Sequence, residues 1–228
     1  MIKTALNRLD ALSLSPSSTS TSGSEPVQVV VLHGYHSNAR SMDMYLSNIV
    51  NELGCHANFT FLDAPHPSLE SLLSKSTRRS KKKYSWASPL GGYEDSLNLL
   101  ARTNRELRGG VDVCIGHSQG GCMLAAILAR KQDREIFPSL KLSIFLSAFY
   151  PLQSEDENPF IQAKSLHIWG SEDAVVDPAY SEDLKSRFIG ARYLVRQGGG
   201  HDPPRCDEST KAMAEAILSI KSDVHILV

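Results

Sequence analysis

Residues 111–121 read Val-Asp-Val-Cys-Ile-Gly-His-Ser-Gln-Gly-Gly, an apolar run that leads through Gly-X-Ser-X-Gly into a second apolar stretch. The β-branched residues before the motif predict a strand, and the long apolar segment after it predicts a buried helix. A serine between such a strand and helix sits on a sharp turn that lifts its hydroxyl clear of the sheet, and Gly116 and Gly120 leave the space that this turn needs. The stretch therefore predicts a nucleophile elbow with Ser118 at its tip.

Composition and charge set the broad class of the protein. The 228 residues are 41% hydrophobic and 21% charged, and 24 Lys and Arg stand against 25 Asp and Glu, so nothing favours nucleic acid as a partner. No apolar run reaches the roughly 18 residues that cross a bilayer. The four cysteines form no C-x-x-C pair, and we expect them to be reduced and to lie largely in core elements. We therefore expect a cytoplasmic protein without stable membrane insertion, whose oligomeric state the sequence leaves open.

The chain divides into a short leader and one domain. Residues 1–26 are rich in Ser and Thr and bury too little apolar surface to fold, which predicts a disordered leader. Organelle targeting is an open alternative for this leader, because Lys3 and Arg8 stand among hydroxyl residues, although Asp10 and Glu25 argue against it. Residues 27–228 are expected to form a single domain.

Within that domain, predicted strands alternate with predicted helices. The apolar patterns predict helices at 42–53, 94–107, after Ser118, at 178–188 and near the end of the chain, and strands at 27–32, 58–62, 111–115, 140–149, 165–169 and 192–195. This alternation predicts a mostly parallel central sheet with helices on both faces. The loops at the carboxyl ends of the strands are then expected to form the functional site.

Residues 68–93 have no clean period, and we expect a short lid-like insertion there. Its basic run, 78–83, is predicted to be a solvated loop rather than a site for an acidic substrate or a membrane surface. Trp86 has two open interpretations, as the lining of an acyl pocket or as an anchor that pins the lid to the core. His66, just before this segment, could reach the pocket, although a role in capping its own loop is favoured.

A serine nucleophile needs a base, and the base needs a group that fixes its tautomer. Asp173 follows the predicted strand 165–169, and His201 follows the predicted strand 192–195. The order Ser, Asp, His is that of the α/β-hydrolases. Two further carboxylates share the loop of Asp173, but Asp177 precedes Pro178 and is predicted to cap a helix, and Glu172 should face the opposite way.

Acyl transfer also needs amide donors for the developing oxyanion. The residue after the nucleophile, Gln119, and the loop after the first strand, with Tyr35, are the expected sources of these amides. Only the backbone is required, so we expect the two side chains to matter little. The remaining histidines lack the carboxylate spacing of a zinc site, and we expect no metal and no cofactor.

Several motifs in register carry a family resemblance. They are His33-Gly34 with Ser37-Asn38, Asp63-Ala64-Pro65-His66, Gly116 to Gly120, Ser147-Ala148-Phe149, Leu166-His167 with Gly170 and Asp173, and Gly199-Gly200-His201. From about residue 27 to 220 the chain resembles the FSH family of serine hydrolases, a branch of the α/β-hydrolases. The resemblance implies a compact esterase or thioesterase fold with a short lid, in which Ser118, Asp173 and His201 act. The basic run and the leader are not part of it.

The leading hypothesis is a serine hydrolase that cleaves a small-molecule carboxylic ester or thioester through an acyl-enzyme on Ser118. A lysophospholipase-like or acyl-protein thioesterase activity is the alternative among enzymes, and a peptidase is favoured less. A different class, a non-catalytic binding module on the same scaffold, is the second alternative. A complete triad argues against this module, which would have no use for Ser118 or His201. The length of the acyl chain and the leaving group cannot be predicted, because the lid and loops shape the pocket.

Overall fold

A computed structural model describes residues 25–73, 82–88, 92–130, 132–151 and 160–222. Its centre is a six-stranded sheet whose neighbouring strands all run parallel, in the order β2-β1-β5-β6-β7-β8. The strands are β1 (Val27–Leu32), β2 (Ala57–Leu62), β5 (Val113–His117), β6 (Leu142–Leu146), β7 (Ser165–Gly170) and β8 (Arg192–Arg196). The parallel sheet predicted from the sequence is confirmed.

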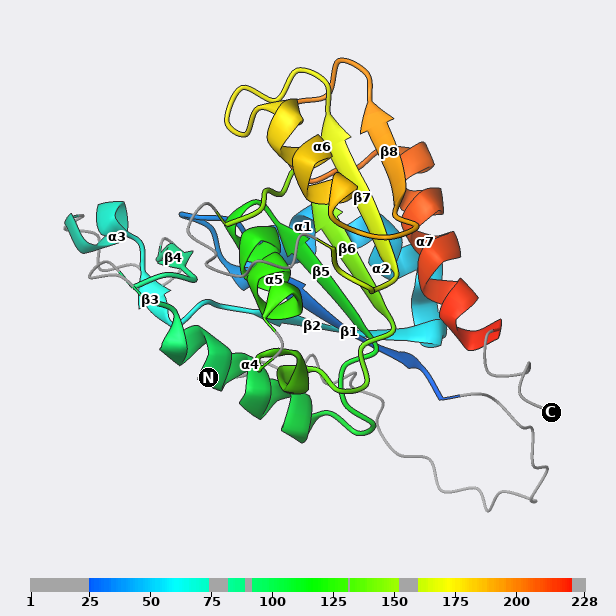
Figure 1. Cartoon of the computed structure of the whole chain (residues 1–228), viewed down its shortest axis with the longest axis horizontal. Coiled ribbons are helices and arrows are strands. Elements are labelled where there is room, and N and C mark those ends of the chain that lie inside the picture. Colours follow the sequence, from blue (N-terminus) through cyan, green and yellow to red (C-terminus); the bar gives the residue numbers. More distant parts are fainter. Residues whose placement is uncertain (1–24, 74–81, 89–91, 131, 152–159, 223–228) are drawn as a thin grey trace, which may run out of the picture.

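Helices cover both faces of this sheet (Figure 1). One face carries α1 (Ala39–Tyr45), α2 (Ser47–Leu53) and α7 (Asp207–Ser222). The other carries α4 (Glu94–Glu106), α5 (Gln119–Ala129) and α6 (Pro178–Ser186). The described connections also contain the short 3₁₀ turns η1 (Gly54–His56) and η3 (Arg134–Ile136).

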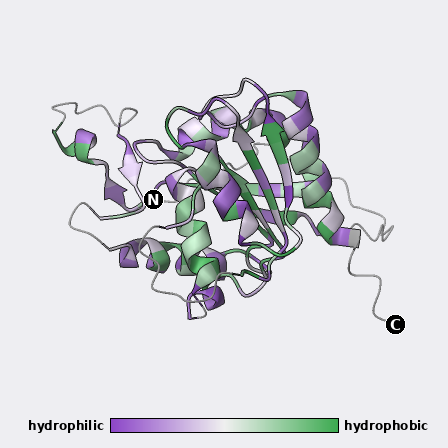
Figure 2. Ribbon diagram, turned by 45° about the horizontal axis from the view of Figure 1, so that its top comes forward, coloured by the Kyte–Doolittle hydropathy of each residue, from purple (hydrophilic) through white to green (hydrophobic). Residues whose placement is uncertain are grey.

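The continuous apolar run of β1 is explained by this double cover. Val29 and Val31 pack into the core on the α1, α2 and α7 side, whereas Val30 and Leu32 pack into the core on the other side. All four side chains are at most 1% exposed, and each such burial contributes about 1.5–3 kcal/mol. Figure 2 shows the same arrangement as green, apolar residues along the central strands.

The structure departs from the sequence predictions in one helix, one strand and two of the cysteines. The single helix expected at 42–53 is two helices, because Leu46 leaves helical geometry with φ −96 and ψ 14 and serves as the cap of both. The strand expected at 140–149 ends at Leu146, and Ser147 after it has a φ of 44. All four cysteines are free, but only Cys114 is fully buried, and Cys55 and Cys206 are exposed, so the prediction that they lie largely in the core was wrong for these two.

The predicted lid region contains regular structure that the sequence did not indicate. A two-stranded antiparallel sheet pairs β3 (His66–Pro67) with β4 (Tyr84–Ser85), and α3 (Leu69–Leu73) lies between them in the chain. These elements project from one side of the main sheet (Figure 1). Most of the basic run, residues 78–81, and residues 1–24 of the predicted leader lie outside the described residues, so both interpretations stay predictions. None of the helices in the described ranges is long and apolar enough to cross a membrane.

Candidate active site

Ser118 occupies the turn between β5 and α5 and adopts a φ of 49 and a ψ of −117. A non-glycine residue rarely takes this conformation, and it persists only where the surroundings enforce it. Glycines on either side allow it. A Cβ on Gly116 would lie 2.6 Å from the Cα of Gly121, and one on Gly120 would lie 2.6 Å from the carbonyl oxygens of Leu32 and His33. The sharp turn that the sequence predicted is therefore present, with Ser118 8% exposed at its tip.

Asp173 and His201 meet at the same edge of the sheet. Asp173 lies in the loop after β7 and His201 in the loop after β8, and Oδ2 of Asp173 is 2.8 Å from Nδ1 of His201. The other carboxylate oxygen accepts hydrogen bonds from the amides of Val175 and Val176, each at 2.9 Å. Since the carboxylate accepts the Nδ1 proton, Nε2 of His201 is left to receive a proton from a nucleophile.

The charge of Asp173 is stabilised by these contacts. Its side chain is 1% exposed, and burial alone would raise its pKa. The hydrogen bonds from Val176, His201 and Val175 outweigh burial and hold the pKa below its ordinary value. The carboxylate is therefore ionised at neutral pH and suited to orient an imidazole.

The two rival carboxylates of this loop lie elsewhere. Glu172 is exposed, and its amide bonds to the Gly199 carbonyl. Asp177 is the N-cap of α6, where its Oδ1 accepts a hydrogen bond of 2.9 Å from the Ala179 amide, with Pro178 at the first helical position. Asp173 is thus the carboxylate of this loop that contacts His201.

The loops of Ser118 and His201 are joined through His117, whose Nε2 lies 2.9 Å from the His201 carbonyl oxygen. Within the described part of the chain, the Ser118 hydroxyl itself forms no hydrogen bond to His201. Such bonds are often long in free enzymes and shorten when substrate binds.

A family model described as "Serine hydrolase (FSH1)" matches residues 22–213. The chain belongs to the FSH1 serine hydrolase family. The resemblance inferred from the motifs is thereby confirmed, and hydrolysis is the activity of the family.

Individual relatives agree with this family. The chain is 30% identical over 196 residues to Esterase CG5412 of Drosophila melanogaster, covering 78% of this chain and 69% of that protein. It is 25% identical to Esterase OVCA2 of Danio rerio over 208 residues, covering 78% of this chain and 91% of that protein. The crystal structure of Zea mays acyl-protein thioesterase 2 superposes with a TM-score of 0.59 at 18% identity, over 87% of this chain and 97% of that one. This last similarity shows the α/β-hydrolase fold.

The residues expected to supply the oxyanion amides of this FSH1 hydrolase lie at the start of α5 and in the loop after β1. Gln119 is the first residue of α5, directly after Ser118, and Tyr35 follows β1. The Tyr35 side chain is 43% exposed, and its hydroxyl donates to Oε2 of Glu70 at 2.8 Å, which ties this loop to α3. The Gln119 side chain accepts a hydrogen bond of 3.0 Å from the Trp86 amide. The Gln119 side chain thus joins the segment after β4 to the elbow, and the expectation that it matters little for catalysis stays a prediction.

Trp86 makes the contacts that an anchor of the projecting segment would make. Its side chain is 1% exposed, and its indole N–H donates to the His33 carbonyl oxygen at 2.7 Å. His66 lies in β3 opposite Ser85, and its Nε2 is 3.8 Å from Oδ2 of Asp95, beyond hydrogen-bond distance. Both residues thus hold or flank the projecting segment, and their predicted contact with substrate stays a prediction.

His33 is a site-shaping residue that sequence reasoning missed. The side chain is 0% exposed, its Nδ1 donates to the Gly34 carbonyl at 2.7 Å, and its Nε2 accepts from the Ala64 amide at 3.0 Å. Burial lowers its pKa to about 4, so the ring is neutral and both bonds persist at neutral pH. The sequence signal is the His33-Gly34 motif, which does not indicate these two hydrogen bonds.

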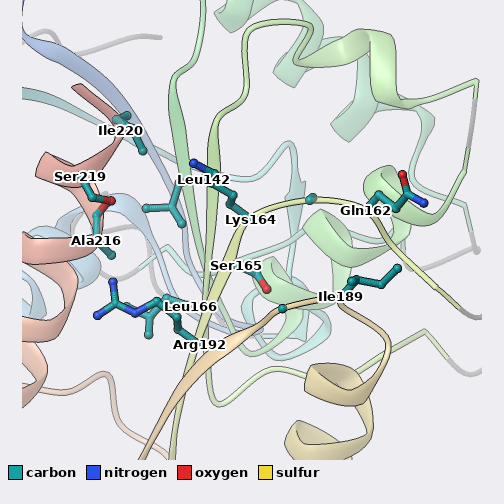
Figure 3. Close-up of a pocket in the computed structure, with 12 residues that line it drawn as sticks. Leu142, Gln162, Lys164, Ser165, Leu166, Ile189, Arg192, Ala216, Ser219 and Ile220 are labelled. Carbon is teal, nitrogen blue, oxygen red and sulfur yellow. The ribbon is translucent and has the colours of Figure 1, made fainter. Parts of the chain in front are cut away.

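A cavity of about 670 Å³ opens at the opposite edge of the sheet (Figure 3). Its lining includes Leu142, Ser165 and Arg192, which are the first residues of β6, β7 and β8. Strands of five or six residues separate this edge from the triad by about 15–20 Å. The cavity therefore lies at the opposite end of the strands from Ser118. Among the described residues, no cluster of three or more His, Cys, Asp or Glu side chains has the geometry of a metal site.

Proposed function

We propose that the protein hydrolyses carboxylic esters or thioesters through an acyl-enzyme on Ser118. The observation that carries the proposal is the 2.8 Å contact between Asp173 Oδ2 and His201 Nδ1, with the carboxylate buried and held by two backbone amides, beside a serine on a strained turn. This arrangement leaves Nε2 of His201 as the one ring nitrogen free to take the serine proton.

In the first half of the reaction, Ser118 Oγ attacks the acyl carbon while His201 Nε2 removes its proton. The carbonyl oxygen becomes negatively charged and is stabilised by the amides of Tyr35 and Gln119. His201 then returns the proton to the departing alcohol or thiol. Asp173 stabilises the imidazolium that forms in between, and remains ionised throughout.

In the second half, water takes the place of the leaving group. His201 removes a proton from the water as it attacks the acyl-enzyme, the same amides stabilise the second oxyanion, and the proton passes to Ser118 as the carboxylic acid leaves. No step requires a cofactor.

One observation favours a long acyl chain, and with it the lysophospholipase-like or acyl-protein thioesterase alternative. Leu69, Leu72 and Leu73 of α3 are 54%, 55% and 77% exposed, and α3 is tied to the Tyr35 loop through Glu70. An acyl chain that packs against these leucines would bind more tightly by about 0.8 kcal/mol for each of its methylenes that is removed from water.

The test measures turnover of p-nitrophenyl esters and acyl thioesters with acyl chains of about two to about sixteen carbons. Ser118→Ala should abolish turnover, and Asp173→Asn should lower kcat by about four orders of magnitude, because the amide favours the wrong imidazole tautomer. Asp177→Asn, in the same loop, is the matched control and should retain activity. Wild-type turnover in Ser118→Ala would overturn the proposal, and an inert wild-type protein that still binds acyl ligands would favour the binding module.

A further inference from the structure

His117 is a buried histidine that the reaction scheme leaves without a role. It is the last residue of β5, directly before Ser118, and is 8% exposed. Its Nε2 lies 2.9 Å from the carbonyl oxygen of His201, 84 residues further along the chain. Since a carbonyl oxygen only accepts hydrogen bonds, Nε2 of His117 carries the proton and donates it.

The ring of His117 is neutral when it makes this bond. Burial lowers its pKa to about 4, and the hydrogen bond to His201 offsets only part of this effect. The groups that act on its charge are His201, Asp202 and Asp173. The His117 and His201 rings are 4.9 Å apart, so a charged His117 would oppose the imidazolium that forms on His201 during catalysis. A neutral donor holds the base without this repulsion.

The other side of the His117 ring faces the loop after β1. A Cβ on Gly34 would lie 2.8 Å from Nδ1 of His117 and 3.2 Å from Cβ of Ser118. The ring therefore packs between the Gly34 loop and the His201 loop, and its own backbone continues into Ser118. One side chain thus lies against both the loop after β1 and the loop of His201.

The carbonyls on either side of His201 are also held. The guanidinium of Arg196 donates to the Gly200 carbonyl at 2.7 Å and to the Asp202 carbonyl at 3.0 Å. Three consecutive carbonyls of this loop thus accept hydrogen bonds from side chains, and His117 is the donor to the central carbonyl, that of His201. Without it, the backbone of His201 would lose its own donor while its neighbours kept theirs.

We propose that His117 is a positioning residue that fixes the backbone of His201, so that Nδ1 stays on Asp173 while Nε2 faces Ser118. The proposal rests on the proposed function of Ser118 and His201. A displacement of a catalytic group by about 1 Å can lower the rate about a hundredfold. Loss of the donor should therefore appear mainly in kcat.

Four variants test the proposal. His117→Phe keeps a planar ring and removes the donor, whereas His117→Gln places an amide N–H near the former Nε2, and His117→Asn carries the same amide one methylene shorter. His167→Phe is the control, because His167 is 1% exposed, packs between Phe145 and Phe188, and lies on β7 away from the elbow. The readouts are kcat, KM, the thermal midpoint and the downfield proton NMR signal of the His201 Nδ1–H bonded to Asp173.

His117→Phe should lower kcat by about ten- to a hundredfold with little change in KM, and should shift or broaden the downfield signal. His117→Gln should restore kcat to within about fivefold of wild type and restore the signal, while His117→Asn should not. His167→Phe should keep both the wild-type kcat and the downfield signal. If His117→Phe does not fold, the comparison of the two amides decides, since only their reach differs.

Equal kcat in His117→Gln and His117→Asn, or wild-type kcat and an unchanged signal in a folded His117→Phe, would overturn the proposal. Ser118→Ala separates this outcome from a failure of the proposed function. Full turnover in Ser118→Ala would remove the serine mechanism, and the NMR signal would still show whether His117 holds His201 on Asp173.

Discussion

Three buried histidines make the stability of this fold sensitive to mild acid. Burial lowers the pKa of His33 to about 4, that of His117 to about 4 and that of His167 to about 3. In the unfolded chain each would titrate near about 6.5. The folded pKa lies below the unfolded one, so the unfolded chain binds more protons in this window. Stability is therefore fully present above about pH 6.5 and is lost as the pH falls from there towards about 4.

The magnitude follows from these values. At about pH 5, each histidine is almost fully protonated in the unfolded chain and almost fully neutral in the fold, which costs about 2 kcal/mol for each residue. The three together cost about 6 kcal/mol, against a total stability of about 5–15 kcal/mol for a typical domain. We expect the protein to lose a large part of its stability between about pH 7.5 and about pH 5.

Urea unfolding, followed by circular dichroism at several pH values, measures this loss. The slope of the unfolding free energy near about pH 5 should correspond to nearly three protons, and His167→Phe should reduce it by about one. This substitution removes a ring whose Nδ1 has no hydrogen-bond partner among the described residues, together with the 3.0 Å contact between its Nε2 and Ser165 Oγ. Equal unfolding free energies at the two ends of the range, or a His167→Phe curve parallel to that of the wild type, would refute the reasoning.

Four further substitutions, at Gly34, Tyr35 and Asp177, test the loops after β1 and β7. Gly34→Ala should lower kcat about tenfold or more, since the new methyl would lie 2.8 Å from His117 Nδ1 and must displace the ring or the loop; wild-type kinetics would contradict this. Tyr35→Phe should keep turnover within about twofold, because it removes only the two exposed hydrogen bonds of the hydroxyl, to Glu70 and from the Leu69 amide, whereas Tyr35→Pro deletes the amide and should raise the barrier by about 3 kcal/mol. Equal losses in the two folded variants would count against the oxyanion assignment. Asp177→Ala should cost about 1 kcal/mol of thermal stability with turnover preserved, and a fall in turnover without a fall in stability would give Asp177 a role in the chemistry.

Much of the architecture could be predicted because it depends on local pattern. The β-branched run before Gly116 and the apolar helix after Ser118 specify a strand, a turn and a helix, whatever the rest of the chain does. Asp173 and His201 could be chosen because each directly follows a predicted parallel strand, and the carboxyl ends of such strands meet at one edge. Asp177 could be set aside because the proline after it marks the start of a helix.

What could not be predicted depends on contacts between loops that are distant in the sequence. The bonds from His117 to His201, from Trp86 to His33 and from Trp86 to Gln119 join residues 84, 53 and 33 positions apart. No periodicity encodes such pairings, because each depends on how one loop lies over another. The β3 and β4 strands have only two residues each, which is too short for an alternating pattern to appear.

Covalent labelling of Ser118 by a fluorophosphonate is the most direct test of the proposed chemistry. The probe phosphonylates a serine that a neighbouring base activates, with loss of fluoride, so one adduct per chain should form on the peptide that contains Ser118, and activity should fall in step with labelling. Ser118→Ala should not label. If activity persists after Ser118 is fully modified, or if a different serine carries the adduct that inactivates the enzyme, Ser118 is not the nucleophile.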